Sequence, residues 1–142
     1  RVIRMVDRKE MTRAVSNIIV NAIRHNPPGT SILAGLYDMP DRTYIVIADS
    51  GAGIPEDIRD SVFDPFVKAD GSRSSGGTGL GLAIARKIVE KHGGTLVLDD
   101  GSGPLIRKLR QDGPESGPGH VADISKYRTF FVISFSRSEA RS

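Results

Sequence analysis

Apolar positions in the first part of the chain recur with the period of an amphipathic helix. Asp7 and Glu10 have the spacing of a capping box, so we expect the helix to begin there. Pro27 and Pro28 are expected to end it, because a residue that precedes proline disfavours the helical conformation. The predicted buried stripe comprises Met11, Ala14, Val15, Ile18, Ala22 and, at its margin, Ile19.

The pattern then changes to the period of strands. Thr30–Asp38 and Thr43–Asp49 are predicted strands that a proline turn joins into a hairpin. A short apolar run, Val2–Val6, is typical of an edge strand. Pro55 suits the first turn of a short helix that runs to about Asp60.

A second helical pattern follows the glycine-rich string GGTGLGL, which begins at Gly76. We expect this helix to place His92 in its last turn as a cation and to stop at Gly93 in the left-handed conformation. Its apolar positions are Leu82, Ala85, Ile88 and Val89.

Glycines that lead into a helix leave N–H groups unpaired at the positive end of the helix dipole, and they let a phosphate approach the main chain. The string therefore predicts a phosphate site, and a flexible loop before an amphipathic helix is the alternative. A Rossmann turn is disfavoured because no apolar strand leads into the glycines, and a Walker loop is excluded because no Gly-Lys-Ser/Thr follows.

The composition is that of a soluble globular protein, with 38% apolar and 26% charged residues. A length of 142 residues suits one domain with its own core. The absence of cysteine excludes disulfides, thiolate catalysis and thiolate zinc sites. The net charge of +3 comes from scattered Lys and Arg, and only 6% of residues are aromatic, so we expect no nucleic-acid partner. No apolar run approaches membrane-spanning length, and no signal peptide is visible.

Polar residues share one face of the first predicted helix. Asn17, Asn21, Arg24 and His25 have the spacing that brings side chains onto the same side. Asparagine is a mediocre helix former, so two of them one turn apart need an explanation. Asn21 offers an oxygen ligand for Mg²⁺, which takes its other ligands from water and phosphates. Arg24 and His25 could reach those phosphates, and the alternative is a polar face in solvent.

Asp49 ends the second predicted strand and precedes Gly51 and Gly53. A carboxylate at the end of a buried strand is costly without a donor, and the glycines allow a ligand to approach closely. Asp49 could therefore accept a hydrogen bond from an exocyclic amine such as that of adenine. The alternative is a turn that the aspartate side chain initiates.

A stretch of small polar residues, Lys68–Ser75, separates the FDPF sequence from the glycine string. Phe63 and Phe66 could anchor one end of a loop in the core. The polar stretch has the composition of a mobile lid, in which Lys68 and Arg73 could engage phosphate.

Together these motifs resemble the ATP-binding catalytic domain of bacterial sensor histidine kinases, within the wider group of gyrase, heat-shock-90, histidine-kinase and mismatch-repair ATPases. NIIVNAIRH is similar to the N box of that family, DSGAGI to its first glycine box, FDPF to its phenylalanine box and GGTGLGL to its second glycine box. The resemblance covers Val2 to Leu98 and resumes at Thr129–Phe135, which looks like the family's final strand.

The resemblance implies a single ATP-binding domain over residues 1–142. Its fold would be an α/β two-layer sandwich, in which helices pack on one face of a mixed sheet. ATP would lie between the helices and a lid at about residues 67–77.

The resemblance also implies roles for individual residues. Asn21 would be the Mg²⁺ ligand and Asp49 the residue that reads adenine. Asn17 matches the first asparagine of the N box and is the one candidate here for a part in the chemistry. The other implied nucleotide-binding positions are Arg24, His25, Gly51, Gly53, Ile54, Phe66, Lys68, Gly77, Thr78, Gly79, Leu80, Gly81 and Thr129.

Two features depart from the family's pattern. Asp99–Lys126 is longer than the usual short turn, and within it Leu105, Ile106 and Leu109 are spaced like one helical turn. We assign this insert no function. No histidine has the context of a phosphoacceptor, so the dimerisation and phosphoacceptor helices are expected upstream of Arg1.

The activity that the resemblance implies is donation of the γ-phosphoryl group of Mg-ATP to a histidine on that neighbouring domain. The indirect partner would be a response regulator. This chain would be monomeric within a homodimeric full-length protein, on the cytoplasmic side if that protein is membrane-anchored. The alternatives are an ATPase or anti-sigma-type serine kinase on the same fold, and an ATP-sensing module without chemistry. Asn17 occupies the position where the hydrolysing relatives carry a glutamate base, and an amide takes no proton at neutral pH, which favours the kinase.

Overall fold

The structure, a computed structural model, describes residues 7–64, 81–112 and 126–136. The expected strand at Val2–Val6 therefore lies outside the described residues. In chain order the elements are α1 (Arg8–His25), β1 (Ile32–Asp38), β2 (Arg42–Asp49), the 3-10 helix η1 (Glu56–Ser61), α2 (Gly81–Lys91), β3 (Thr95–Asp99), α3 (Pro104–Asp112) and β4 (Thr129–Ser136).

The strands form one four-stranded sheet in the order β1-β2-β4-β3. Each pairing is antiparallel, so the described part of the sheet is antiparallel throughout, whereas the sequence led us to expect a mixed one. The predicted hairpin is confirmed as β1 and β2, with Ile32 opposite Asp49 and Asp38 opposite Thr43. The last of the described strands, β4, inserts between β2 and β3.

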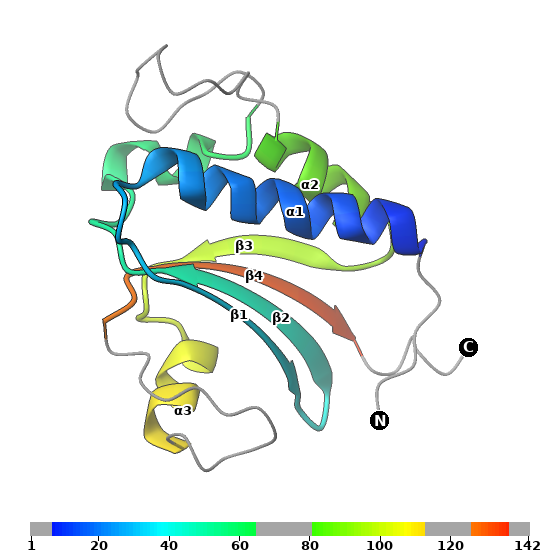
Figure 1. Cartoon of the computed structure of the whole chain (residues 1–142). Coiled ribbons are helices and arrows are strands. Elements are labelled where there is room, and N and C mark those ends of the chain that lie inside the picture. The colour runs from blue at the N-terminus through cyan, green and yellow to red at the C-terminus, as the bar shows by residue number, and fades with distance from the viewer. Residues whose placement is uncertain (1–6, 65–80, 113–125, 137–142) are drawn as a thin grey trace.

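Helices α1 and α2 lie side by side on one face of this sheet (Figure 1). The buried residues that the helical period predicts are confirmed: Ala14, Ile18 and Ala22 in α1, and Leu82, Ala85, Ile88 and Val89 in α2. Most of them join sheet residues in the main core, which the strands supply with Ile47, Leu96, Phe131, Ile133 and Phe135. This layer is the sandwich that the sequence predicts.

The opposite face of the sheet carries α3 (Figure 1). The sequence led us to expect helices on one face only, and α3 departs from that expectation. The predicted helical turn in the insert is confirmed, because Ile106 is fully buried and Leu105 and Leu109 pack beside it. Strand β4 is buried on both faces, so its alternate side chains need a second apolar cover. That second core contains Val46, Ala48, Ile106, Tyr127, Phe130 and Val132.

The helix ends follow the predicted local chemistry. Asp7 Oδ1 accepts from the Glu10 N–H at 3.1 Å, which confirms the cap of α1. Gly93 has a φ of 83°, the left-handed stop expected after α2. His92 directly follows α2, where its Nε2 contacts the Asp7 N–H at 3.0 Å and its Nδ1 lies 2.8 Å from the Ile88 carbonyl. His92 therefore links the end of α2 to the start of α1.

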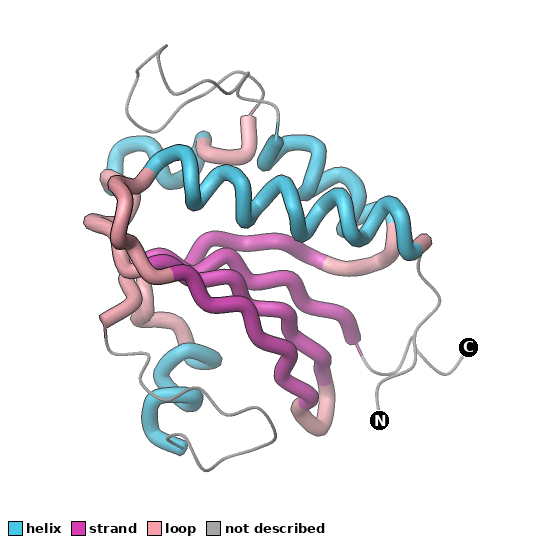
Figure 2. The backbone as a smooth tube through the Cα atoms, viewed as in Figure 1, coloured by secondary structure: helices cyan, strands magenta, loops and turns pink. Residues whose placement is uncertain are grey.

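Most connecting loops gather at one end of the sheet (Figure 2). The C-terminal end of β2, the loop that follows it and the start of β4 meet there, because Asp49 is paired with Thr129. The short helix predicted after Pro55 is confirmed as η1. This end of the molecule therefore brings together segments from two separate parts of the sequence.

Candidate functional site

The asparagine face of α1 lies against the start of α2. Asn17 Nδ2 donates to the Gly81 carbonyl at 3.3 Å, and both residues are partly buried. Gly81 is the first residue of α2 and the last glycine of the GGTGLGL string. A direct hydrogen bond thus joins two motifs whose bonded residues are 64 positions apart in the sequence. Asn21, one turn further along α1, is partly buried as well.

His25 carries a buried polar atom that needs an explanation. Within the described residues, its Nδ1 is buried and has no hydrogen-bond partner. Buried polar atoms are nearly always paired, and one left unpaired costs free energy of folding. A ligand that offers a donor or an acceptor at this nitrogen would remove that cost. Arg24, the neighbouring cation in the last turn, is exposed.

Asp49 is a buried carboxylate at the end of β2, with 5% of its surface exposed. Burial raises the pKa of its carboxyl group, and two hydrogen bonds oppose that rise, one from the Gly51 N–H and one from the Asn26 side chain. The Gly51 N–H donates to Asp49 Oδ1 at 3.0 Å, so the turn that the aspartate initiates is present. Asp49 was expected either to initiate a turn or to accept a hydrogen bond from a ligand. The two roles are compatible, since a carboxylate that closes a turn still has acceptor sites free for a ligand.

The glycines after Asp49 are required for different reasons. Gly53 has a φ of 93°, which a residue with a side chain rarely adopts. A Cβ on Gly51 would instead overlap Oδ1 of Asn26. The space that glycine leaves at position 51 is therefore filled by a side chain of this chain. Ile54, which directly follows Gly53, packs against the main core.

Thr129 completes this end of the sheet. It is the Cα partner of Asp49 in the β2–β4 pairing and is 4% exposed. The adjacent Arg128 N–H donates to the Asp49 carbonyl at 3.0 Å, which extends the pairing by one bond. The structure thus brings together the predicted residues Asp49, Gly51 and Thr129.

Part of the predicted site lies outside the described residues. The lid at residues 67–77, with Arg73, belongs to this part, as does the phenylalanine-box residue Phe66. Phe63 is described and does anchor the segment, because its ring meets Phe131 edge-on at 6.0 Å and Arg86 lies 4.8 Å above it. The predicted site residues outside the described ranges are Phe66, Lys68, Gly77, Thr78, Gly79 and Leu80.

The metal expectation can be tested against the donors present. Across the described ranges, no group of three or more His, Asp or Glu side chains could hold a metal ion by itself. Asn21 supplies a neutral oxygen, which is the kind of ligand that Mg²⁺ accepts when phosphates and waters provide the rest. The donor set therefore fits a metal that arrives with a phosphate compound.

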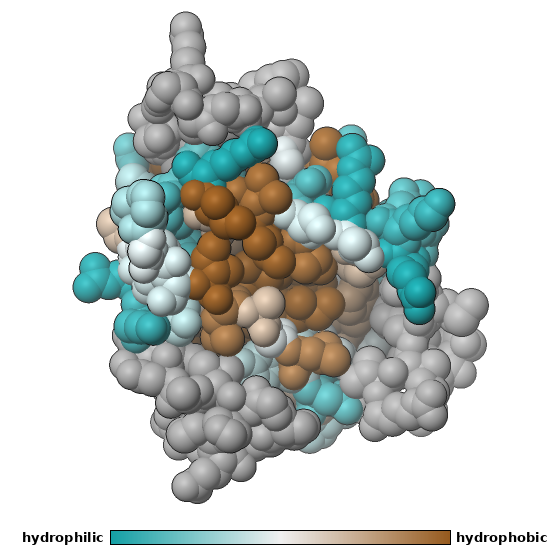
Figure 3. All heavy atoms as spheres, viewed as in Figure 1, coloured by the Kyte–Doolittle hydropathy of each residue, from teal (hydrophilic) through white to brown (hydrophobic). Residues whose placement is uncertain are grey.

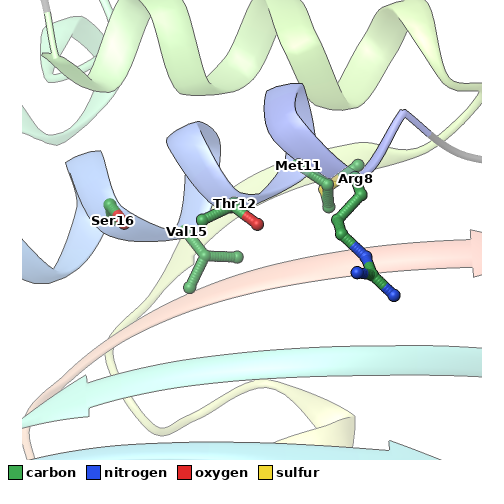
Figure 4. Close-up of a pocket in the computed structure, with 5 residues that line it drawn as sticks. All are labelled: Arg8, Met11, Thr12, Val15 and Ser16. Atoms are coloured by element: carbon green, nitrogen blue, oxygen red, sulfur yellow. The ribbon is translucent and has the colours of Figure 1, made fainter.

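The other flank of α1 has a different character. A shallow groove there is lined by Arg8, Met11, Thr12, Val15 and Ser16, whose side chains extend from one side of the helix (Figure 4). Apolar surface continues over this side of the molecule (Figure 3), and the exposed large apolar residues include Ile23 of α1 and Leu36 of β1. At about 100° per residue, this flank and the asparagine flank lie on opposite sides of the buried stripe of α1. The groove is thus separate from the predicted site.

Comparison with known proteins places these observations in a family. Residues 6–136 match the family of histidine kinase-, DNA gyrase B- and HSP90-like ATPases. The chain belongs to this family. The sensor protein IrlS of Burkholderia pseudomallei is 43% identical over 97 residues, which cover 67% of this chain and 20% of IrlS. The mycobacterial sensor histidine kinase MprB has a solved structure with a TM-score of 0.68 and 32% identity, covering 94% of this chain and 76% of that one.

These relatives define the kind of domain. This chain is an ATP-binding domain of the sensor histidine kinase type, and the α/β fold and the resemblance predicted from its motifs are confirmed. It spans about a fifth of the length of the curated relatives it matches. A complex of the histidine kinase ThkA with the response regulator protein TrrA has a TM-score of 0.60 and 20% identity, covering 96% of this chain and 31% of that one, and it supports the fold alone. No helix among the residues described is both long and apolar enough to cross a membrane.

One residue of this site was missed at the sequence level. Asn26 follows the last helical residue of α1 and precedes Pro27, so it reads as an ordinary helix cap. In the structure its Nδ2 donates to the Ala22 carbonyl at 2.8 Å, and its Oδ1 lies beside Gly51 in the loop that follows Asp49. The sequence does show a polar amide directly after the asparagine face. The neighbouring residues do not predict which distant residue that amide contacts.

Proposed function

We propose that this domain binds Mg-ATP and donates its γ-phosphoryl group to a histidine on a dimerisation domain of the same protein. The observation that carries the proposal is the position of α1. Asn17 on its polar flank donates to Gly81, the last glycine of the GGTGLGL string, and Asn26, which follows its last residue, lies against Gly51 beside the buried Asp49. Nine residues separate the two points, about 13 Å along a helix, a distance that an extended nucleoside triphosphate can cover.

Each end of this path suits a different part of the nucleotide. Asp49 would accept a hydrogen bond from the six-amino group of adenine, since an ionised carboxylate is an acceptor only. Backbone N–H groups at the start of α2 would face the phosphates, where the helix dipole favours negative charge. Asn21 would be the protein ligand of Mg²⁺, which neutralises charge on the phosphates when bound. Arg24 and His25 would lie beside the phosphates, and His25 Nδ1 would gain a partner.

Asn17 offers no side-chain group that could act as a general base to activate water. Its amide nitrogen donates to the Gly81 carbonyl, and an amide does not accept a proton at neutral pH. An imidazole acceptor needs less activation than water because it is already a nucleophile. Positioning and charge neutralisation are then the domain's contribution to transfer. We place the domain on the cytoplasmic side, with a response regulator receiving the phosphoryl group in a later step.

The test separates binding from transfer. The 142-residue chain should bind Mg-ATP in a calorimeter yet release little phosphate and carry no label after incubation with γ-labelled ATP. Adding the dimerisation helices of the same protein, joined or separate, should give an acid-labile phosphohistidine. Steady turnover by the chain alone would favour an ATPase, phosphoserine would favour a serine kinase, and binding without any transfer would favour an ATP-sensing module.

A further inference from the structure

Arg59 joins the loop that follows β2 to the start of the insert Asp99–Lys126. Its Nε donates to the Ile54 carbonyl at 3.2 Å, and its Nη1 donates to Asp100 Oδ2 at 3.0 Å. Arg59 lies in η1, whereas Asp100 follows β3, so one side chain bridges two connections that are far apart in the sequence. Because the guanidinium group is planar and its nitrogens are fixed relative to one another, the two contacts also fix the Ile54 carbonyl relative to Asp100.

The carboxylate of Asp100 is held in place by the insert itself. Its Oδ1 accepts from the Ser102 N–H at 3.0 Å and from the Ser102 hydroxyl at 2.6 Å, while Oδ2 faces the guanidinium group. The neighbouring Asp99 Oδ1 accepts from the Gly101 and Gly103 N–H groups at 2.6 Å and 3.2 Å. Gly101 has a φ of 101°, in the region that favours glycine. The insert therefore begins with a turn that presents a charged acceptor to η1.

The loop that Arg59 contacts is the one that follows Asp49. It contains Gly53, whose φ of 93° is rarely open to other residues and whose missing side chain restricts the main chain little. Further along, Val62 is buried in the main core, and Ile54 packs against the same core. The hydrogen bond from Arg59 thus holds the main chain between the glycine and this anchored part.

We propose that Arg59 is a positioning residue for the nucleotide site and that the insert supplies its counter-ion: the bridge from Asp100 through Arg59 to the Ile54 carbonyl holds the loop after β2 in the conformation that receives the base. This inference rests on the function proposed above, and it gives the insert a part in that function. Arg59 acts through the main chain of Ile54 and not by contact with the nucleotide. A loop held before binding loses less conformational freedom when the ligand arrives, so the bridge raises nucleotide affinity.

The exposure of the pair limits the size of the effect. The side chains of Arg59 and Asp100 are 37% and 39% exposed, and ion pairs at such places contribute little free energy. Loss of the bridge is therefore expected to change an equilibrium constant by at most about fivefold. A change of this size is measurable in a dissociation constant.

The experiment is a double-mutant cycle on Mg-ATP affinity, measured by calorimetry. Arg59→Met removes both donors and keeps an apolar stem. Asp100→Asn keeps an oxygen for Ser102 but turns an amide donor toward Arg59. We expect Arg59→Met to weaken Mg-ATP binding about fivefold and Asp100→Asn about threefold. The double variant should bind no more weakly than Arg59→Met alone, because both changes remove one bridge.

Two comparisons separate positioning from general damage. Mg-ADP affinity should fall by the same factors, because the proposed effect is at the base and not at the γ-phosphate. Glu10→Gln is the matched control, since Glu10 and Lys91 form an ion pair of 3.0 Å that joins the start of α1 to the end of α2. This variant should keep the parent's Mg-ATP affinity. Urea unfolding of each variant measures stability separately, because the dissociation constant of a protein that is almost entirely folded does not follow its unfolding free energy.

The outcomes are distinct. Non-additive losses in Arg59→Met and Asp100→Asn, alike for the two nucleotides and absent from Glu10→Gln, support the proposal. Parent-like affinity in both variants, or losses that multiply in the double variant, overturn it even where the unfolding free energy falls, and they leave ATP binding by the parent intact.

Asp100→Asn keeps the proposal testable if Arg59→Met fails to fold, because Asp100 is an exposed residue of the insert. Weaker binding of Mg-ATP by Asp100→Asn, with Glu10→Gln unchanged, then supports the bridge, and parent-like binding overturns it. A parent that binds no Mg-ATP overturns the proposed function, and this inference with it.

Discussion

Asp49 and Thr129 lie directly opposite each other in the β2–β4 pairing, and both side chains are almost completely buried. They are far apart in the sequence, and only the insertion of β4 beside β2 brings them together. A carboxylate in such a place is costly unless donors surround it. This pair marks the end of the sheet where the proposed base-binding site lies.

The first prediction concerns the choice of base. Guanine presents a carbonyl oxygen where adenine presents an amine, so the buried Asp49 carboxylate would face an acceptor. An unpaired charged acceptor costs about 2–3 kcal/mol, so Mg-GTP should bind at least about thirtyfold more weakly than Mg-ATP. Asp49→Asn should weaken ATP binding and narrow this gap, since an amide can turn its donor toward guanine.

A competition titration with both nucleotides measures that gap. Asp41→Asn, which removes an exposed carboxylate in the turn between β1 and β2, is the matched control and should keep the parent's preference. Equal affinity of the parent for ATP and GTP would mean that Asp49 serves the turn alone.

The second prediction concerns Asn21 and the metal. Asn21→Ala should fold normally and bind Mg-ATP about tenfold more weakly, because one protein ligand of the metal is lost. In the presence of EDTA, the variant and the parent should bind ATP alike. Thr12→Ala, an exposed residue on the opposite flank of α1, is the control for helix effects. Calorimetry that finds the same Mg-ATP affinity in Asn21→Ala and the parent would contradict the assignment.

The third prediction follows from Nδ1 of His25, which has no hydrogen-bond partner in the part of the chain that the structure describes. His25→Phe removes a buried polar atom and keeps an aromatic ring, so the free energy of unfolding without nucleotide should rise by about 1 kcal/mol. Mg-ATP should then stabilise the variant less than it stabilises the parent, because the proposed partner of Nδ1 is gone. Urea unfolding with and without nucleotide measures both effects. A variant that is less stable without nucleotide would show that His25 is already satisfied.

The fourth prediction concerns pH and Asp100. Hydrogen bonds from the Ser102 hydroxyl and N–H, with Arg59 at 3.0 Å, lower the pKa of Asp100 from 3.8 to about 2. Because the pKa of the folded state lies below that of the unfolded state, the stabilising contribution is present above pH 3.8 and is lost as pH falls toward 2. Arg59 also donates to the Ile54 carbonyl at 3.2 Å, so this contact ties the β3–α3 connection to the loop before η1.

Urea unfolding of the parent and Asp100→Asn at pH 6 and pH 2.5 tests this. The parent should be the more stable protein at pH 6, and the difference in unfolding free energy should shrink at pH 2.5. A difference that stays constant between the two values would mean that the Asp100 interactions persist in the unfolded chain.

Local pattern was sufficient for the elements themselves. The cap at Asp7, the apolar stripe of α1, the hairpin of β1 and β2, and the stop at Gly93 are decided by neighbours within a few residues, and each was predictable. The motifs likewise identified the family, because the backbone chemistry of a phosphate loop needs particular residues at fixed spacing.

The sequence could not decide which apolar face of one element packs against which face of another. The sequence indicates a strand at Thr129–Phe135, but its burial on both faces, its place between β2 and β3, and α3 as the cover of the second face depend on how whole layers pack. The same is true of polar contacts. Asn26 had no predicted role and Gly51 was expected to be a glycine that admits a ligand, and only the packing of α1 on the sheet makes the side chain of Asn26 fill the space at Gly51. Such contacts join residues far apart in the chain, and no local pattern records them.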